Sequence, residues 1–253
     1  MKIIVTMGRG GTGKTSFVSL IADYFIRKGD TPLLLVDLDP DQNLGEMVGV
    51  DLEAEGRKTV AELLEDTFIG KGGTTIGVAP SERIEHRIWR DGLYEGKNFD
   101  FLALGTKWVE GCYCMPDAAL RDALSRLTKQ YKYVLIDAPG GLEHLNRRVT
   151  ADVDEIFDVI GPSSKSFSHL IRAKRVAEES GIHWKNFSSI GGFLFPQGLA
   201  TRAKEISEIR YLGKIEFDEV VAKRVIEGLP LIGLPVDLPG PASVQQILES
   251  AGY

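Results

Sequence analysis

The sequence predicts the α/β fold class: a doubly wound, mostly parallel sheet flanked by helices. Short apolar, β-rich runs alternate with segments of helical period along all 253 residues. Several of these runs are apolar without alternation, as in strands that are covered on both faces. Strands that alternate with helices imply right-handed crossovers and helices on both faces of one sheet. Because this length suits one large α/β domain, we expect a single domain over residues 1–253.

Seven apolar runs are the predicted strands of this sheet. They are Ile3–Thr6, Leu33–Asp37, Phe99–Leu104, Tyr133–Asp137, Ile156–Ile160, Ile190–Phe195 and Gly213–Phe217.

Helices are predicted between and after these strands. Between the first two, apolar residues at helical spacing form one stripe, made of Phe17, Leu20, Ile21, Tyr24 and Phe25. Gly29 follows as a stop signal. Further helices are expected at Pro116–Lys129, Ser166–Ser180 and Ser243–Ser250, the last opened by Ser243 and Gln246 at capping-box spacing. Gly70–Gly73 is a predicted turn and Gly228–Gly240 a predicted late loop.

Composition and charge exclude several classes of protein. Hydrophobic residues make up 43% and charged residues 26%, which is typical of globular proteins. The net charge of −6 argues against a broad surface for nucleic acid or anionic lipid. No apolar run approaches the roughly 18 residues of a membrane span. We therefore expect a cytoplasmic protein that uses neither membrane nor nucleic acid as a partner.

A glycine-rich loop follows the first strand and precedes the first helix. It reads Gly8-Arg9-Gly10-Gly11-Thr12-Gly13-Lys14-Thr15, then Ser16. This matches G-x-x-x-x-G-K-[ST], the phosphate-binding loop of P-loop NTPases, in the required strand–loop–helix context. The glycines let backbone N–H groups converge on phosphate oxygens, Lys14 adds charge between the β- and γ-phosphates, and the Thr15 hydroxyl reaches Mg. The loop thus predicts ATP or ADP with Mg in a Rossmann-like sheet.

Carboxylates stand at the ends of two predicted strands. Leu33–Val36 is followed by Asp37, Asp39 and Asp41, and Tyr133–Ile136 is followed by Asp137. Strand ends in such sheets lie on the ligand side, so Asp137 is placed like the Walker-B Asp that helps hold Mg. For any one Asp the alternative is a helix cap or turn former. Gly140 and Gly141 would let the following loop move with the γ-phosphate.

With these residues in view, the chain resembles the deviant-Walker ATPases, the group of MinD, ParA and the nitrogenase iron protein. That family's loop reads x-K-G-G-x-G-K-[ST], matched here from Gly10 to Thr15, and its D-x-D-P motif is matched from Asp37 to Pro40. Within the group, the likeness is strongest to the CooC-type accessory ATPases, which mature nickel-containing carbon monoxide dehydrogenase. Residues 112–114 and 140–145 carry that likeness, which covers most of the chain.

The resemblance implies a nucleotide-dependent homodimer that holds two ATP molecules between its subunits. Lys14, Asp39 and Arg9 would be the catalytic residues: Asp39 would position the attacking water and residue 9 would reach the partner's phosphates. The family has Lys at residue 9, whereas Arg9 keeps the charge in a longer, planar group. The Asn-Lys pair with which the family often reads adenine is also absent near Ile190–Phe195.

Cys112 and Cys114 are the two cysteines of the chain. A C-x-C pair in an extended segment would place both sulfurs on one face. On spacing alone, the pair fits either metal ligands or two buried small hydrophobes. Two thiolates are half of a four-coordinate site, and a two-fold homodimer would supply the other half. The resemblance favours such an interface site, holding Ni or Zn.

Three functions are consistent with these sequence features. The leading expectation is an ATP-hydrolysing dimeric maturation factor that assists nickel insertion into a client metalloenzyme of the carbon monoxide dehydrogenase type. The alternatives are an ATP-dependent electron-transfer protein with an interface Fe–S cluster and a positioning ATPase of the ParA/MinD type.

Overall fold

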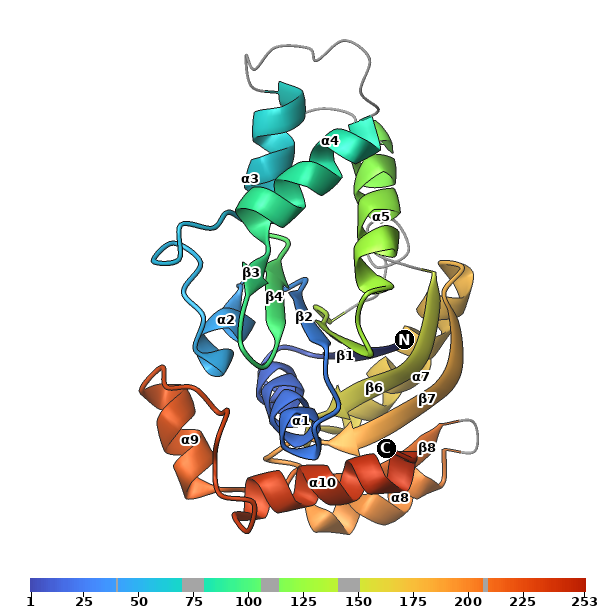
Figure 1. The fold of residues 1–253 in the computed structure, drawn as a ribbon. Helices are drawn as coiled ribbons and strands as arrows, with labels where there is room; N and C mark the ends of the chain where they lie inside the picture. The colour runs from blue at the N-terminus through green and yellow to red at the C-terminus, as the bar shows by residue number, and fades with distance from the viewer. Residues whose placement is uncertain (40, 70–79, 106–113, 141–150, 207–208) are drawn as a thin grey trace.

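A computed structural model describes residues 1–39, 41–69, 80–105, 114–140, 151–206 and 209–253. Its centre is an eight-stranded sheet in the order β3-β4-β2-β5-β1-β6-β7-β8 (Figure 1). Every neighbouring pair is parallel except β3 with β4. The doubly wound, mostly parallel sheet expected from the sequence is confirmed. The strands are β1 (Lys2–Gly8), β2 (Leu33–Asp37), β3 (Tyr94–Glu95), β4 (Asp100–Ala103), β5 (Tyr133–Asp137), β6 (Asp152–Ile160), β7 (His183–Gly191) and β8 (Arg210–Lys214).

Helices cover both faces of this sheet. They are α1 (Lys14–Lys28), α2 (Asn43–Val48), α3 (Val60–Leu64), α4 (Pro80–Arg87), α5 (Cys114–Thr128), α7 (Ser164–Glu179), α8 (Ala200–Lys204), α9 (Glu219–Ile226) and α10 (Pro239–Ala251). Two π-helical turns, η1 (Glu65–Ile69) and η2 (Ile88–Gly92), continue α3 and α4, and a 3-10 turn, η3 (Gln197–Leu199), precedes α8. Figure 1 shows α3, α4 and α5 gathered at one end of the molecule and α8, α9 and α10 at the other. None of the helices in the described ranges is both long and apolar enough to cross a bilayer.

Alternation along each strand divides the core into two layers. Val5 and Met7 of β1 belong to the cluster that includes Leu120 of α5 and Leu170 of α7. Ile4, between them, belongs to the opposite cluster with α1, α2 and α10. Burial on both faces explains why β2 and β5 are continuously apolar and why their bounds are as predicted.

The start and end of α1 follow from its sequence. Gly13 precedes the helix with φ 94° and Gly29 closes it with φ 72°, both in the left-handed region that favours glycine. The Gly29 N–H reaches back to the Ile26 carbonyl, which satisfies one of the last free acceptors of the helix. The predicted stop at Gly29 is confirmed.

Other predicted boundaries are wrong. Helix α10 begins at Pro239, four residues before the expected Ser243, because Pro at the first helical position suits an N-terminus. The Ser243 hydroxyl does not form a capping box; it donates to the Gly240 carbonyl and accepts from the Glu216 N–H. The expected turn at residues 70–73 lies outside the described residues.

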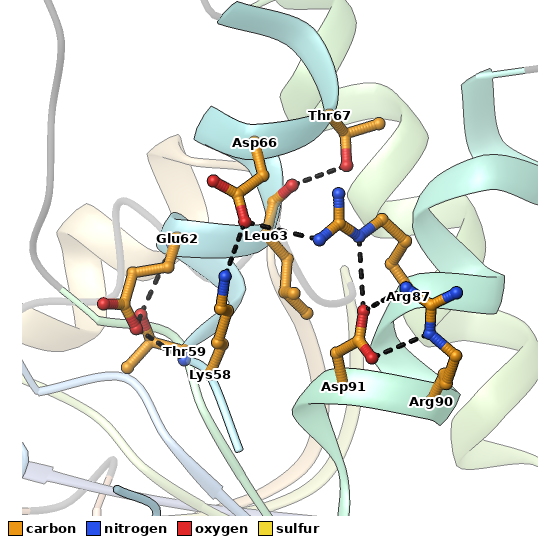
Figure 2. Close-up of polar contacts among 9 residues, drawn as sticks. All are labelled: Lys58, Thr59, Glu62, Leu63, Asp66, Thr67, Arg87, Arg90 and Asp91. Atoms are coloured by element: carbon orange, nitrogen blue, oxygen red, sulfur yellow. Dashed lines mark hydrogen bonds and ion pairs between the residues drawn. The ribbon is translucent and has the colours of Figure 1, made fainter. Parts of the chain in front are cut away.

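An ion-pair network ties the two π-helical turns together (Figure 2). Asp66 of η1 accepts from Lys58 at 2.8 Å and from Arg87 at 3.3 Å. Asp91 of η2 pairs with Arg87 at 3.4 Å and with both Nε and Nη2 of Arg90 at 2.7 Å. These contacts hold residues 58–66 beside residues 87–91.

Candidate functional site

The glycine-rich loop joins the end of β1 to the start of α1 in the middle of the sheet. Gly8 and Gly11 have φ of 143° and 75°, which other residues rarely adopt. A Cβ at Gly8 would lie 2.4 Å from the Val159 carbonyl oxygen, so only glycine fits there. The Thr12 N–H and hydroxyl both donate to the Arg9 carbonyl, at 3.3 and 2.8 Å, and close the loop.

This loop presents an anion-binding surface. Gly13 provides no side-chain cap, so the first N–H groups of α1 remain available at the positive end of the helix. Lys14 and Ser16 are buried behind the loop, and Thr15 is half-buried. The residues predicted to bind phosphate therefore come together as one cradle.

The two predicted strand-end carboxylates meet beside the loop. Strand β5 lies between β1 and β2, and its register pairs Asp137 with Thr6 on one side and Asp37 on the other. Both carboxylates are fully buried. Asp37 accepts from the Asp39 N–H at 2.9 Å and from the Leu44 N–H at 3.0 Å, so it holds the loop that carries Asp39.

Burial raises the pKa of both carboxyl groups. The pKa of Asp37 is raised to about 8 by loss of solvation and by the nearby Asp137 charge. The pKa of Asp137 is raised to about 7 by burial, against lowering contributions from the Thr15 side chain and the Lys14 charge. Such groups favour a cation that would compensate their charge.

Asp137 and Thr15 fit the Mg site that the fold implies. Neither carboxylate oxygen of Asp137 makes a hydrogen bond of normal geometry among the described residues, although both are buried. Unpartnered buried oxygens are costly, and a hard cation accepts oxygen ligands of this kind. The donor set of one carboxylate and one hydroxyl next to a phosphate cradle suits Mg.

Lys14 and Asp39 face each other across the cradle. The Lys14 Nζ lies 3.7 Å from Asp39 Oδ2, and the side chains are 8% and 17% exposed. Arg9 is exposed at the tip of the loop. A Cβ at Gly140 would lie 3.4 Å from the Gly8 carbonyl oxygen, so the segment after β5 passes directly against the loop. Gly141 lies outside the described residues.

A cavity of about 470 Å³ opens over this cradle. Residues 10–16 form one part of its wall, and Asp39, Asp41 and Asn43 add polar side chains. The remaining wall comes from residues 161–162, 192–194 and 217–226, together with Met47. Its volume is within the range of small-molecule sites.

Part of this wall was not predicted from the sequence. The expected strand Ile190–Phe195 ends at Gly191 instead, so Phe193 belongs to the loop beyond the strand, where ligands bind. Gly192, the first residue after the strand, passes close to the phosphate loop, since a Cβ there would lie 2.1 Å from the Thr12 carbonyl oxygen. Helix α9, which completes the cavity, was also missed.

Asp158 is one of the buried carboxylates that were not predicted from the sequence. Asp158 of β6 is 1% exposed, and neither of its oxygens has a hydrogen-bond partner among the described residues. Burial raises its pKa to about 7, with the Lys14 charge acting in the opposite direction. The sequence could have indicated this burial. Asp158 lies within the predicted strand Ile156–Ile160, and both faces of such a strand are covered.

The cysteine pair is placed only in part. Cys112 lies outside the described residues, and Cys114 is the first residue of α5. The expected extended conformation is therefore wrong at Cys114, whose backbone is helical. No group of three or more His, Cys, Asp or Glu suited to a metal ion occurs in the part of the chain that the structure describes.

Comparison with known proteins supports the assignment of the loop. A family model described as an AAA domain matches residues 1–170. The chain is 31% identical to the uncharacterized ATP-binding protein MJ0685 of Methanocaldococcus jannaschii over 98% of this chain and 97% of that protein. It is 29% identical to the carbon monoxide dehydrogenase accessory protein CooC of Rhodospirillum rubrum over 87% of this chain and 85% of that protein.

Solved structures share the fold. The cell division ATPase MinD of Pyrococcus furiosus matches with a TM-score of 0.69 at 21% identity, over 99% of this chain and 98% of that one. A plasmid partition protein of Borrelia burgdorferi, solved with AMPPNP, matches with a TM-score of 0.71 at 16% identity, over 99% and 98%. The chain therefore belongs to this AAA-domain family and is a P-loop protein of the deviant-Walker type, similar to CooC.

Proposed function

We propose that this protein binds Mg-ATP and hydrolyses it as a conformational switch. The observation that carries the proposal is the convergence of Lys14, Asp39 and Asp137 on one phosphate cradle. The cavity is large enough for a nucleotide, and the buried carboxylates suit a bound cation.

Each residue has a role that follows from its position. The loop N–H groups and the α1 N-terminus would bind the phosphates, and Lys14 would stabilise charge that develops on the transferred group. Thr15 and Asp137 would hold Mg, which neutralises phosphate charge when bound. Asp39 would orient the attacking water. Because Lys14 approaches Asp39 in this structure, we infer that the bound phosphates separate this pair.

A nucleotide-dependent homodimer fits the same site. Arg9 is an exposed residue of the phosphate loop. A second copy would place that charge on the partner's phosphates, in the manner of an arginine finger. Because the Arg9 side chain is long and its guanidinium is planar, its contact with the partner's phosphates would depend on how the two subunits are oriented.

For the cellular role, we propose maturation of a metalloenzyme of the carbon monoxide dehydrogenase type. The support is the similarity to CooC over most of both chains. Cys112 and Cys114 of two subunits would form a four-thiolate site for Ni or Zn, formed in the ATP-bound dimer and released after hydrolysis.

The test has an ATPase arm and a metal arm. Lys14→Ala should abolish phosphate release, whereas Lys28→Ala, an exposed lysine of the same helix, should not. Turnover by Lys14→Ala at the normal rate would refute the ATPase assignment.

The metal arm uses protein purified without oxygen, with and without ATP. One Ni or Zn per dimer, lost in Cys112→Ser, would support the maturation role. An iron–sulfur absorbance spectrum would instead indicate the electron-transfer alternative. Protein free of metal that binds liposomes or DNA with ATP would indicate a positioning ATPase.

A further inference from the structure

A groove of about 680 Å³ lies beside strands β6, β7 and β8, away from the phosphate cradle. It is lined by the first part of β7 and of β8, and by Glu155 near the start of β6. The phosphate loop follows the carboxyl end of β1, and β1, β6, β7 and β8 are parallel. Because parallel strands all begin on the same side of a sheet, the groove lies opposite the cavity over the phosphate cradle.

Residues 183–187 of β7 form an open edge of the described sheet. Strand β7 has nine residues and β8 has five, and their pairing begins only where Ser188 meets Arg210. On its other side, β7 pairs with β6 from its first residue to its last. Three of the five edge residues are exposed. Such an edge offers backbone N–H and C=O groups with which another extended chain can pair.

Four cations from four different elements converge on the groove. They are Lys174 of α7, Lys185 of β7, Lys204 of α8 and Arg210 of β8. The chain as a whole carries a net charge of −6, so this gathering of positive charge is local. Lysines on an edge strand can serve simply to prevent strand addition. Lys174 and Lys204 come from helices, however, so edge protection does not explain why they line the groove.

The carboxylates close to these cations are already engaged. Glu155, which lines the groove, is 1% exposed and accepts from a serine hydroxyl of β7 at 2.9 Å. Burial is the largest cause that raises the pKa of Glu155, which favours its neutral form. Asp154 pairs with Lys185 at 2.5 Å, whereas Arg210 Nη2 donates to a neutral acceptor, the Ser250 carbonyl, at 2.7 Å. The positive charge of the groove therefore suits an acidic ligand.

We propose that this groove binds an acidic segment of a partner protein, which lies in extended conformation along the open edge of β7. Five residues of a strand span about 16 Å, at roughly 3.3 Å per residue, which is enough for a short peptide. Backbone pairing would supply affinity, and the cations would select carboxylate side chains. Trp184, Tyr211 and Arg210 in the groove wall are of residue types that are enriched at protein interfaces.

A nucleic acid would meet the same positive charge, but the open strand edge favours a protein ligand. Nucleic-acid strands lack the regular repeat of peptide N–H and C=O groups that pairs with a strand edge. The two kinds of ligand are therefore distinguished by whether binding depends on backbone hydrogen bonds of the ligand.

Fluorescence anisotropy with short labelled peptides tests this proposal. A probe of alternating glutamate and threonine should bind the full-length protein. A probe with lysine in place of glutamate should bind at least about tenfold more weakly, because like charges would meet in the groove. The acidic probe with all its backbone nitrogens methylated keeps its charge but cannot donate to a strand edge. It should also bind at least about tenfold more weakly.

Charge variants connect this binding to the groove. Lys204→Glu reverses an exposed charge of the wall and should weaken the acidic probe by about three- to tenfold. Arg210→Gln removes a second charge and should weaken it by about two- to fivefold. Lys97→Glu is the matched control, since Lys97 is an exposed lysine between β3 and β4, at the other edge of the sheet. It should leave the affinity unchanged.

Several results would overturn the proposal. They are equal affinity for the glutamate and lysine probes, full affinity of the methylated probe, and unchanged affinity in both Lys204→Glu and Arg210→Gln. Absence of binding by every probe would overturn it as well. Single-stranded DNA that bound more tightly than the acidic probe, and lost affinity in Lys204→Glu, would make the groove a nucleic-acid site instead. None of these measurements requires ATP, so they remain decisive whether or not the protein hydrolyses it.

Discussion

The Lys14 Nζ lies 3.7 Å from Asp39 Oδ2, although the two residues come from different strand–loop junctions. Lys14 opens α1 after β1, and Asp39 follows β2. Asp37 fixes this relationship, because it accepts the Asp39 N–H and the Leu44 N–H from its buried position. Under the proposed function, this pair would lie where the γ-phosphate and the attacking water meet.

Asp39→Ala should separate ATP binding from hydrolysis. The phosphate loop remains complete, so ATP should still bind. Loss of the carboxylate that orients water should slow phosphate release by at least about a hundredfold, the scale of general-base contributions. Single-turnover kinetics would measure this, with Glu53→Ala as the control, since Glu53 is an exposed carboxylate that does not line the nucleotide cavity.

The same Asp39 variant should accumulate as an ATP-bound dimer. Size-exclusion chromatography with light scattering would show it. A monomer with ATP bound, or hydrolysis at the normal rate, would contradict the role given to Asp39.

Arg9→Ala tests the contact between subunits. ADP should bind nearly as well as in the wild type, because the loop N–H groups remain. ATP-dependent dimerisation and hydrolysis should both fall, since the charge donated to the partner's phosphates is gone. Arg9→Lys should retain part of both activities. Unchanged hydrolysis in Arg9→Ala would make Arg9 an ordinary exposed loop residue.

The sequence predicts the centre of this fold better than its periphery. Strands β2 and β5 are predicted with their observed bounds, because burial on both faces leaves a continuous apolar run between polar ends. Helix α9 was missed because β-branched Val220, Val221 and Val225 favour strands. In the structure, Asp218 caps this helix by accepting from the Val220 and Val221 N–H groups, and tertiary packing overrides the propensity.

In the candidate site, too, some residues could be predicted from the sequence and others could not. The phosphate cradle is local in sequence, so the motif alone identifies Gly8 to Ser16. The contacts of Asp37 and the position of Phe193 depend on segments that meet only in the folded sheet. Gly192 illustrates the difference, since its packing against Thr12 joins residues 180 positions apart in the chain.

The network in Figure 2 should contribute modestly to stability. Asp66→Asn removes the negative charge that pairs with both Lys58 and Arg87. We expect a loss of about 0.5–1 kcal/mol in the free energy of unfolding, since the Asp66 side chain is 42% exposed. The loss should shrink in about 1 M salt, where the screening length falls to roughly 3 Å. Denaturant melts at low and high salt would measure it.

The pH dependence of this network has a defined sign. The Lys58 hydrogen bond is the largest cause that lowers the pKa of Asp66. A depressed carboxyl pKa stabilises the fold above the unfolded pKa, near 3.8, and that stabilisation is lost as pH falls further. The difference between wild type and Asp66→Asn should therefore be constant above about pH 5 and vanish in acid. A difference that grew in acid would exclude this network as its source.

Asp158 should make the nucleotide-free protein less stable as the pH rises through neutrality. Burial raises its folded pKa to about 7 from the ordinary value near 3.8. Between these values the folded chain keeps a proton that the unfolded chain has lost, so stability falls from about pH 4 to pH 7 and then levels. Each pKa unit is worth about 1.4 kcal/mol, so the full effect is at most on the order of 4 kcal/mol.

Asp158→Asn tests whether Asp158 causes this fall in stability with pH. A neutral amide in the same position cannot titrate, so the slope of unfolding free energy against pH should change. Denaturant unfolding of Asp158→Asn should be measured from pH 4.5 to 8.5. Relative to its unfolded state, the folded variant should bind one proton fewer than the folded wild type does. The other carboxyls whose pKa is raised keep their part of this pH dependence, so it should weaken without disappearing; they are Asp23, Asp37, Asp137 and Glu155. The exposed Asp41→Asn should follow the wild-type curve. An Asp158→Asn curve parallel to that of the wild type would mean that Asp158 is ionised in the folded protein, and a compensating charge near β6 would then be required.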